Sequence, residues 1–554
     1  MTNKEIANVF NDLAKIMELH QENKFKIRSY SNAYLTLRKL DTPLTDMSEE
    51  DLSGIKGVGK AISAKIREFI ETGTLDTLKK YQDKTPLGVQ EMLKIKGFGP
   101  KKVYEVWTKL GSESVGELLY ACNENRLIEL KGFGKKTQED LIQKLEYFQK
   151  SKNQFHYASL EQEAKDVVTF IQQKLPDATV QLTGAIRRLS STLSSIEILV
   201  GLTSSIDSIF KGEELVLQQK DNGHYIAHSK QQTPVIIYHC SPDEYGSKLF
   251  LTTATTEFRD AFIAQYPKTS FKGLPTEAAV FEKAKLPEIL PELREDEYSI
   301  SLASNKQLPT LIEETDIIGV LHAHSTYSDG IASLKDMAKE CQRLGYEYLG
   351  ITDHSKSAFY ANGLKVDRLQ AQWEEINQLN ATFKDGFKIF KGIESDILSN
   401  GSLDYEEDIL KQFDFIIASI HSNLKMDEQK ATTRLIKAIE NPYTTILGHP
   451  TGRLLLSRKG YPIDYKKVID ACAANGVVIE LNANPYRLDL DYQWIPYATE
   501  KGVSIAINPD AHSLEGIKDI HFGVLAARKG YLQREDCLNS KSLAAFENWL
   551  HKRS

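Results

Sequence analysis

The sequence predicts a chain of several domains: an all-α front, an α+β middle and a rear (β/α)7 barrel. A short Gly-containing segment recurs three times within the first 150 residues, and each copy lies between helical patterns. The following region mixes helical stretches with short β-branched runs. From residue 316 onward, seven β-rich runs alternate with helical stretches, which favours a parallel sheet with helical crossovers.

Changes in composition and in the expected secondary structure place the domain boundaries. We expect a helical region at 1–150, an α+β region at 151–300, a linker at 301–315 and the barrel at 316–554. The linker is expected because the sequence around it is rich in proline and charge.

Composition narrows the class of protein. The 554 residues are 41% hydrophobic and 26% charged, which is ordinary for a globular protein. No run of about 18 apolar residues predicts a membrane-spanning helix, and the polar N-terminus does not resemble a secretory signal. Five scattered cysteines without a CxxC pair favour a reducing, cytoplasmic setting. The net charge is −7, but the first 150 residues are mildly basic.

The three recurring segments of the front are Ile55–Lys60, Ile95–Lys101 and Leu130–Lys136. In each copy two glycines bracket one apolar residue, and lysine lies beside the start of the next helix. Open backbone amides and a helix N-terminus bind phosphate without reading bases, whereas packing corners without a ligand are the plainer alternative. Three copies favour DNA-backbone binding, and the segments resemble helix-hairpin-helix motifs. The expected contacts are Gly57, Gly59, Lys60, Gly97, Gly99, Lys101, Gly132, Gly134 and Lys135.

The seven β-rich runs of the rear region end in His, Asp or Glu. A lone histidine is usually structural, but six histidines at strand ends are hard to explain in that way. In a closed barrel the carboxyl ends of the strands converge on one face, so these side chains are expected to share a pocket. Imidazole and carboxylate without thiolate suit Zn²⁺, Mn²⁺ or Fe²⁺.

The segments HAHSTYSDG, TDH, GIE, SIH, GHP and DAH together resemble the PHP phosphoesterase domain, whose fold is a distorted seven-stranded barrel. The resemblance implies three divalent ions and a bridging role for Glu394. It implies the ligands His322, His324, Asp329, His354, Glu394, His421, His449, Asp510 and His512. The residues expected to act in catalysis are Glu394, His324 and Asp510, with Arg453 and Arg487 gripping phosphate. Surface arginines without a function are the alternative for the last two.

The front and middle regions resemble family X DNA polymerases, on Gly184–Arg188, Ser195–Val200, Tyr245–Leu249 and the KFKIRSYSNAY segment. That family holds two Mg²⁺ ions on three aspartates, at the positions that are Ser195, Glu197 and Ile236 here. Because serine is a poor ligand and isoleucine is none, we expect polymerase activity to be lost. The family's lyase lysine matches Lys65. Bacterial family X polymerases fused to a PHP domain match the whole chain.

Four functions remain open at this point. The first is a metal-dependent DNA phosphodiesterase in repair, a 3′–5′ exonuclease and abasic-site endonuclease acting on gapped DNA, single-stranded 3′ ends or abasic sites. The second is a small-molecule phosphatase of the histidinol-phosphatase type, which the helical DNA-binding front disfavours. The third is an active gap-filling polymerase/3′–5′ exonuclease, and the fourth is a non-catalytic DNA-end binder with structural metals. The oligomeric state is not predicted.

Overall fold

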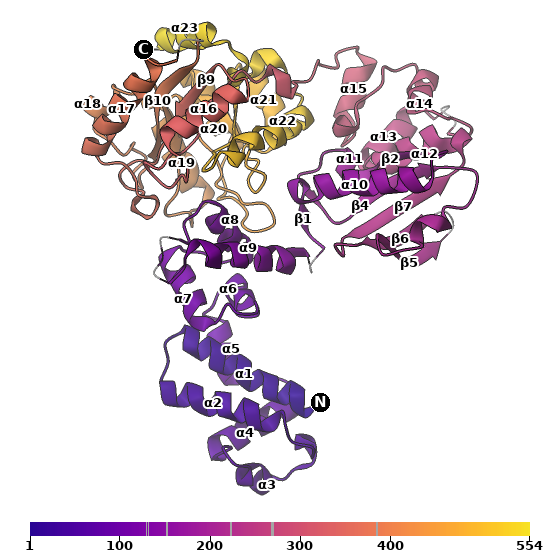
Figure 1. Cartoon of the computed structure of the whole chain (residues 1–554), viewed down its shortest axis with the longest axis vertical. Coiled ribbons are helices and arrows are strands. Elements are labelled where there is room, and N and C mark those ends of the chain that lie inside the picture. Colours follow the sequence, from indigo (N-terminus) through magenta and orange to yellow (C-terminus); the bar gives the residue numbers. More distant parts are fainter. Residues whose placement is uncertain are drawn as a thin grey trace. The chain divides into compact units, whose positions relative to one another are not determined.

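The computed structural model describes residues 1–553 except 129, 131, 151–152, 222–223, 268–270 and 384–385. Lys131, within the third recurring segment, therefore lies outside the described residues. The chain forms two compact units, Met1–Gln149 and Lys150–Ser554, and the second contains both the middle region and the barrel (Figure 1). Among the described residues, no helix has the length and apolarity needed to cross a bilayer.

The first unit is helical. Its helices are α1 (Asn3–Leu19), α2 (Lys24–Leu37), α3 (Glu49–Gly54), α4 (Lys60–Thr72), α5 (Asp76–Gln82), α6 (Leu87–Met92), α7 (Pro100–Lys109), α8 (Val115–Asn123) and α9 (Lys135–Lys150). The recurring segments are the turns before α4, α7 and α9. In each turn the first glycine has a positive φ, between 81° and 95°, which a side chain would strain. The apolar residue between the glycines is buried, as Val58, Phe98 and Phe133 show.

The middle region is an α+β fold around a five-stranded sheet of order β2-β4-β7-β6-β5, in which β4 and β7 are parallel. Its strands are β1 (Phe155–His156), β2 (Thr179–Leu182), β3 (Thr192–Leu193), β4 (Ile196–Gly201), β5 (Leu215–Asp221), β6 (His224–Ser229) and β7 (Pro234–Cys240). Its helices are α10 (Tyr157–Lys174), α11 (Gly184–Arg187), α12 (Tyr245–Thr253), α13 (Thr256–Gln265), α14 (Glu277–Ala284) and α15 (Tyr298–Ser304). The segment expected to be a linker begins within α15, and it buries Leu311 and Ile312.

The rear region is a seven-stranded parallel sheet in sequence order, as expected. The strands are β8 (Gly319–Val320), β9 (Tyr348–Ile351), β10 (Lys388–Asp396), β11 (Phe415–Ser419), β12 (Ile446–Leu447), β13 (Val478–Asn482) and β14 (Ile505–Asn508). The helices are α16 (Leu334–Arg343), α17 (Val366–Asn380), α18 (Glu407–Leu410), α19 (Glu428–Ile439), α20 (Tyr465–Asn475), α21 (Ile495–Glu500), α22 (Ile520–Lys529) and α23 (Leu543–Arg553).

The barrel is nearly closed. A parallel bridge joins Ala323, just after β8, to Ala511, just after β14, and the His324 amide donates to the Ala511 carbonyl at 2.8 Å. One apolar cluster takes side chains from all seven strands and their immediate extensions, and it includes Phe546 of α23, which stacks on Tyr348. A larger cluster packs the helices against the outside of the sheet. The strand ends therefore converge on a well-packed frame.

Candidate metal centre of the barrel

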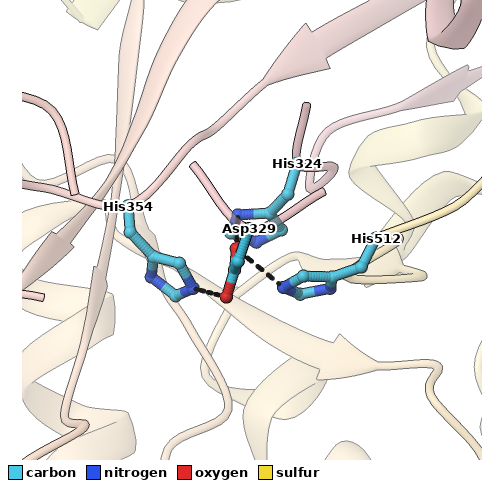
Figure 2. Close-up of side chains that lie close together, drawn as sticks. All are labelled: His324, Asp329, His354 and His512. Carbon is cyan, nitrogen blue, oxygen red and sulfur yellow. Dashed lines mark ion pairs between the residues drawn. The ribbon is translucent and has the colours of Figure 1, made fainter. Parts of the chain in front are cut away.

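The nine side chains expected to be ligands converge at the carboxyl ends of the strands. Eight of them form three groups, and within each group the ligand atoms lie within 4.8 Å of one another. The ninth, His449, contacts Glu394 of the third group. The groups are His324, Asp329, His354 and His512 (Figure 2); His322, His324 and Asp510; and His354, Glu394 and His421. The local frame explains the convergence, because eight of the nine side chains lie at or just beyond the end of a parallel strand, and Asp329 lies in the longer loop after β8.

Glu394 lies at the centre of this arrangement. Its carboxylate is 3.0 Å from His421 Nε2, 2.9 Å from His449 Nε2 and 2.9 Å from His354 Nδ1. The side chain is buried, and β10 carries it within the strand rather than after it. Burial alone would raise the pKa of Glu394, but the imidazoles of His421, His354 and His322 hold that pKa well below its usual range. Glu394 is therefore ionised and faces several ligand atoms at once.

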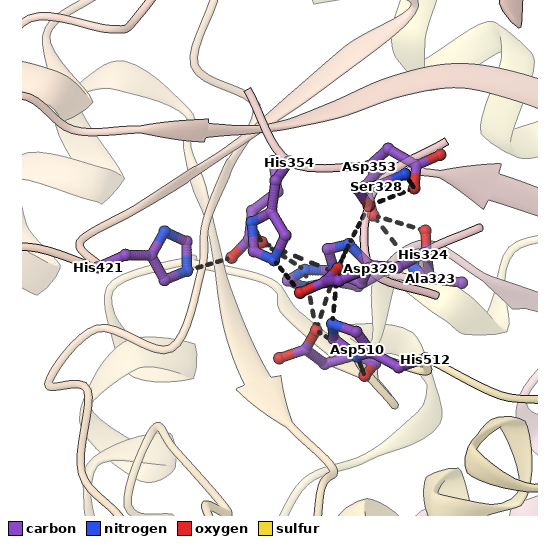
Figure 3. Close-up of polar contacts among 12 residues, drawn as sticks. Ala323, His324, Ser328, Asp329, Asp353, His354, His421, Asp510 and His512 are labelled. Atoms are coloured by element: carbon purple, nitrogen blue, oxygen red, sulfur yellow. Dashed lines mark hydrogen bonds and ion pairs between the residues drawn. The ribbon is translucent and has the colours of Figure 1, made fainter. Parts of the chain in front are cut away.

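Asp510 and Asp329 lie among the histidines of the centre (Figure 3). Asp510 Oδ1 is 3.0 Å from His324 Nε2 and 3.4 Å from His322 Nε2, and its backbone is left-handed, with φ 53°. Such a backbone is unusual for a non-glycine residue and is typical of functional sites. Asp329 Oδ2 is 3.5 Å from His354 Nε2, while Asp329 Oδ1 is 3.3 Å from His512 Nε2.

The donor set fits divalent metal ions. Several buried ligand atoms make no hydrogen bond to any described residue, namely His322 Nε2, both ring nitrogens of His354 and Glu394 Oε2. Burial, with His512 and His354 nearby, lowers the pKa of His324 to about 3, so that ring is neutral, as a ligand must be. Buried carboxylates and imidazoles that face one another, with several ligand atoms lacking a hydrogen bond, are the pattern that divalent cations would satisfy.

Three acidic residues orient the ligands. The ligand motifs alone did not identify two of them, Glu480 and Asp396. Glu480, fully buried on β13, accepts from His322 Nδ1 at 2.7 Å, and Asp396 Oδ1 lies 2.5 Å from His421 Nδ1. Both residues lie in segments at strand ends, and that position is the signal by which the sequence could have revealed them. Asp353 accepts from the Ser325 and Ser328 amides and hydroxyls, and so fixes the loop that precedes Asp329. Such partners set the tautomer and ring orientation of a metal-ligating histidine.

The two arginines expected to grip phosphate differ in position. Arg487 is buried, and its Nε lies 3.9 Å from Asp510 Oδ2, so the structure brings it to the centre. Arg453 instead directs its guanidinium at the Arg487 carbonyl at 3.0 Å, at the Leu488 carbonyl and at Asp491. Its donors hold the loop after β13, which favours the alternative of a structural arginine.

The three turns of the helical unit present the expected phosphate-binding groups. All six glycines are exposed, and so are Lys60, Lys101 and Lys135 at the first helical positions or next to them. Gly59 and Gly99 are the N-caps of α4 and α7 and make no side-chain cap hydrogen bond. Lys65 lies on α4 and donates to Thr77 Oγ1 at 2.6 Å.

The polymerase-like positions lie side by side on the middle sheet. Glu197 of β4 is in register with Ile236 of β7, and Ser195 immediately precedes β4. Glu197 accepts from the Ala185 amide at 3.3 Å and from the Tyr238 hydroxyl at 3.2 Å. The register therefore brings the three positions together, and one of them carries a carboxylate.

Comparison with known proteins gives the relationships of each region. A helix-hairpin-helix domain model matches residues 1–75, a SAM-like helix-hairpin-helix tandem matches 89–146, and a PHP domain matches 321–484. A probable phosphatase of Caldanaerobacter subterraneus subsp. tengcongensis is 32% identical over 208 residues, covering 34% of this chain and 74% of that protein. A similar probable phosphatase of Syntrophotalea carbinolica is 29% identical over 181 residues, covering 32% of this chain and 68% of that protein.

One relative matches from end to end. The DNA polymerase/3′–5′ exonuclease PolX of Bacillus subtilis is 33% identical over 577 residues, which cover 100% of both chains. Its name includes polymerase activity, so this comparison favours the active polymerase/exonuclease over our expectation of lost polymerase activity. With its helix-hairpin-helix regions, its PHP barrel and this full-length relative, the chain belongs to the PolX family of DNA polymerase/3′–5′ exonucleases.

Proposed function

We propose that the barrel is a metal-dependent DNA phosphodiesterase that removes nucleotides from 3′ ends and cleaves at abasic sites in DNA repair. The observation that carries the proposal is the convergence of nine His, Asp and Glu side chains at one end of the barrel. The helical unit supports DNA as the substrate because its three turns present amides and lysines to a phosphate backbone. Gapped DNA, single-stranded 3′ ends and abasic sites are the proposed substrates.

The nine side chains would hold three divalent ions, with Mn²⁺, Zn²⁺ and Fe²⁺ as candidates, and Glu394, whose carboxylate faces both His354 and His421, would act as the bridging ligand. Such ions neutralise a phosphodiester and lower the pKa of bound water toward ~7. Glu480, Asp396 and Asp353 fix the ring orientations and the Asp329 loop. Arg487, beside Asp510, would bind a phosphate oxygen.

The test is hydrolysis of 5′-labelled DNA with each metal, with and without an abasic site, and hydrolysis of histidinol phosphate as the competing substrate. We expect laddering from the 3′ end in Mn²⁺ that is lost in His322→Ala, while that variant still binds DNA. A wild-type protein that hydrolyses histidinol phosphate and leaves DNA intact would contradict the proposal. DNA cleavage that persists in His322→Ala would show that the barrel centre is not responsible.

We further propose that polymerase activity is lost, although the full-length relative makes an active polymerase the second candidate. Two contacts support the loss. Glu197 is the single carboxylate among the three positions, and it accepts hydrogen bonds from Ala185 and Tyr238. Arg187, at the end of α11, forms a two-point ion pair with Glu277, so its guanidinium is not open to a triphosphate.

Primer extension by Asp510→Ala, in Mg²⁺ and in Mn²⁺, separates the two candidates because that variant removes competing hydrolysis. We expect no extension of a gapped primer. Template-directed extension that disappears in Glu197→Gln would establish the active polymerase instead.

A further inference from the structure

The loops beside the metal centre carry exposed apolar side chains. In the described part of the barrel, the exposed large apolar residues are Ile331 (54% exposed), Phe359 (86%) and Val366 (39%). Single exposed apolar residues are ordinary, but Ile331 and Phe359 lie in two loops that follow neighbouring strands, and Val366 is the first residue of α17. Ile331 follows Asp329 by two residues and Phe359 follows His354 by five, and both of these ligand candidates are shown in Figure 2.

The loop of Phe359 is well packed. Ala358, Ala361 and Leu364, on either side of Phe359 in the sequence, are buried, and the Leu364 amide donates to the His354 carbonyl at 2.8 Å. Gly363 packs so tightly that an added Cβ would lie 2.0 Å from the Ser355 carbonyl oxygen. The backbone beside Phe359 is therefore packed, while the ring itself is exposed.

Further contacts tie this loop to the metal centre. Ser357 donates to Asp396, the partner of His421, at 2.7 Å. The Tyr360 ring lies 6.3 Å from the His354 ring and 6.1 Å from the Phe359 ring, so one aromatic residue separates Phe359 from a ligand candidate.

The second loop lies against the first. The Asn362 side chain donates to the Ser328 carbonyl at 3.5 Å, and Arg368 donates to the Tyr327 carbonyl. The Ile331 amide donates to the carbonyl of His512, another ligand candidate, at 2.9 Å. We name the pair Ile331 and Phe359 the apolar lip.

We propose that the apolar lip stacks an unpaired nucleobase at the 3′ end of single-stranded DNA and so positions the terminal phosphodiester at the metal centre. This inference rests on the proposed function. A flat exposed ring stacks on any base, which suits an exonuclease that must accept all four. The exposed Lys356 and Lys365 flank Phe359 and suit the accompanying phosphates.

The test pairs removal of the ring with removal of the base. Wild type, Phe359→Ala, Phe359→Trp and the exposed control Ile263→Ala are assayed on single-stranded DNA with either intact or abasic (tetrahydrofuran) 3′-terminal residues. We expect Phe359→Ala to raise KM for intact DNA at least about fivefold, the change that ~1 kcal/mol of stacking produces. On the abasic-ended strand the same variant should match wild type, while Phe359→Trp and Ile263→Ala should match wild type on both.

A binding measurement keeps the lip separable from the proposed function. A 3′-terminal 2-aminopurine, joined by a cleavage-resistant phosphorothioate, should be quenched by wild type and not by Phe359→Ala. If wild type cleaves no DNA, the proposed function fails while the quenching still decides the lip. Three results would each overturn the stacking proposal. They are an equal rise in KM by Phe359→Ala on both strands, equal quenching by wild type and Phe359→Ala, and a change in oligomeric state without a kinetic change.

Discussion

Replacing Glu480 with glutamine tests whether the buried carboxylate of β13 organises the metal centre. Its Oε1 accepts from His322 Nδ1 at 2.7 Å and from Asn508 Nδ2 at 3.0 Å. Its Oε2 accepts from the His449 amide at 2.9 Å and from Asn482 Nδ2 at 3.3 Å. All four contacts are donors, so the NH₂ of a glutamine would face two donors in either orientation.

The expected effect of Glu480→Gln follows from those contacts. Loss of hydrogen bonds to a charged acceptor costs about 1.5–3 kcal/mol each, and loss of a ligand's orienting partner weakens metal binding by roughly 10–100-fold. We expect a metal dissociation constant raised by that factor, measured by calorimetric titration of the metal-free protein. A lowered Tm should accompany it.

Glu500→Gln is the matched control, because Glu500 is exposed on α21 in the same barrel. It should leave both quantities unchanged. If Glu480→Gln binds metal with wild-type affinity, His322 is not oriented by Glu480, and the reasoning from its hydrogen bonds is refuted.

Three further predictions concern the centre and its surroundings. EDTA should abolish DNA hydrolysis and added Mn²⁺ should restore it; activity that survives chelation would contradict the metal centre. His521→Ala should lower Tm at pH 6 and not at pH 9. His521 donates hydrogen bonds to Glu161 and Glu314, which raise the pKa of His521, so its stabilisation is full below ~6.5 and fades as pH rises through the raised pKa. An equal Tm decrease at both pH values would refute this electrostatic origin. Arg453→Met should destabilise the barrel by ~1–3 kcal/mol in urea unfolding, because Arg453 donates to two carbonyls and to Asp491. The kcat for DNA hydrolysis should stay nearly unchanged. A loss of kcat of about 100-fold or more would instead support a phosphate-gripping role.

The barrel was predictable because hydrophobic runs and strand-end ligands are local patterns. Parallel strand order then brings residues as distant as His322 and His512 together without further information. Hydrogen bonds between side chains that are far apart in the sequence were not predictable in the same way. Glu480 and His322 are 158 positions apart, and nothing local distinguishes an orienting acid from a ligand. The acceptors of Arg453 were not predictable for the same reason, because all three come from a loop more than 30 residues away.

Contacts between the middle region and the barrel show how the two are joined within the second compact unit. Lys529 of α22, buried at the end of its helix, donates to the Arg188 carbonyl at 2.8 Å and to Glu295 at 2.5 Å. The residue that follows α11 is thus fixed from the barrel side. Helix α11 ends at Arg187, whose guanidinium is paired with Glu277.

The Arg187–Glu277 pair is part of a larger charge network. Glu277 also accepts from the fully buried Arg294, so the network has at least three members. Removing Glu277 alone would leave the buried Arg294 with only the more distant Glu288, at 3.8 Å, as a charged partner, and such a change is strongly destabilising. To free Arg187 for a negatively charged ligand, a variant therefore has to replace Glu277 and Arg294 together.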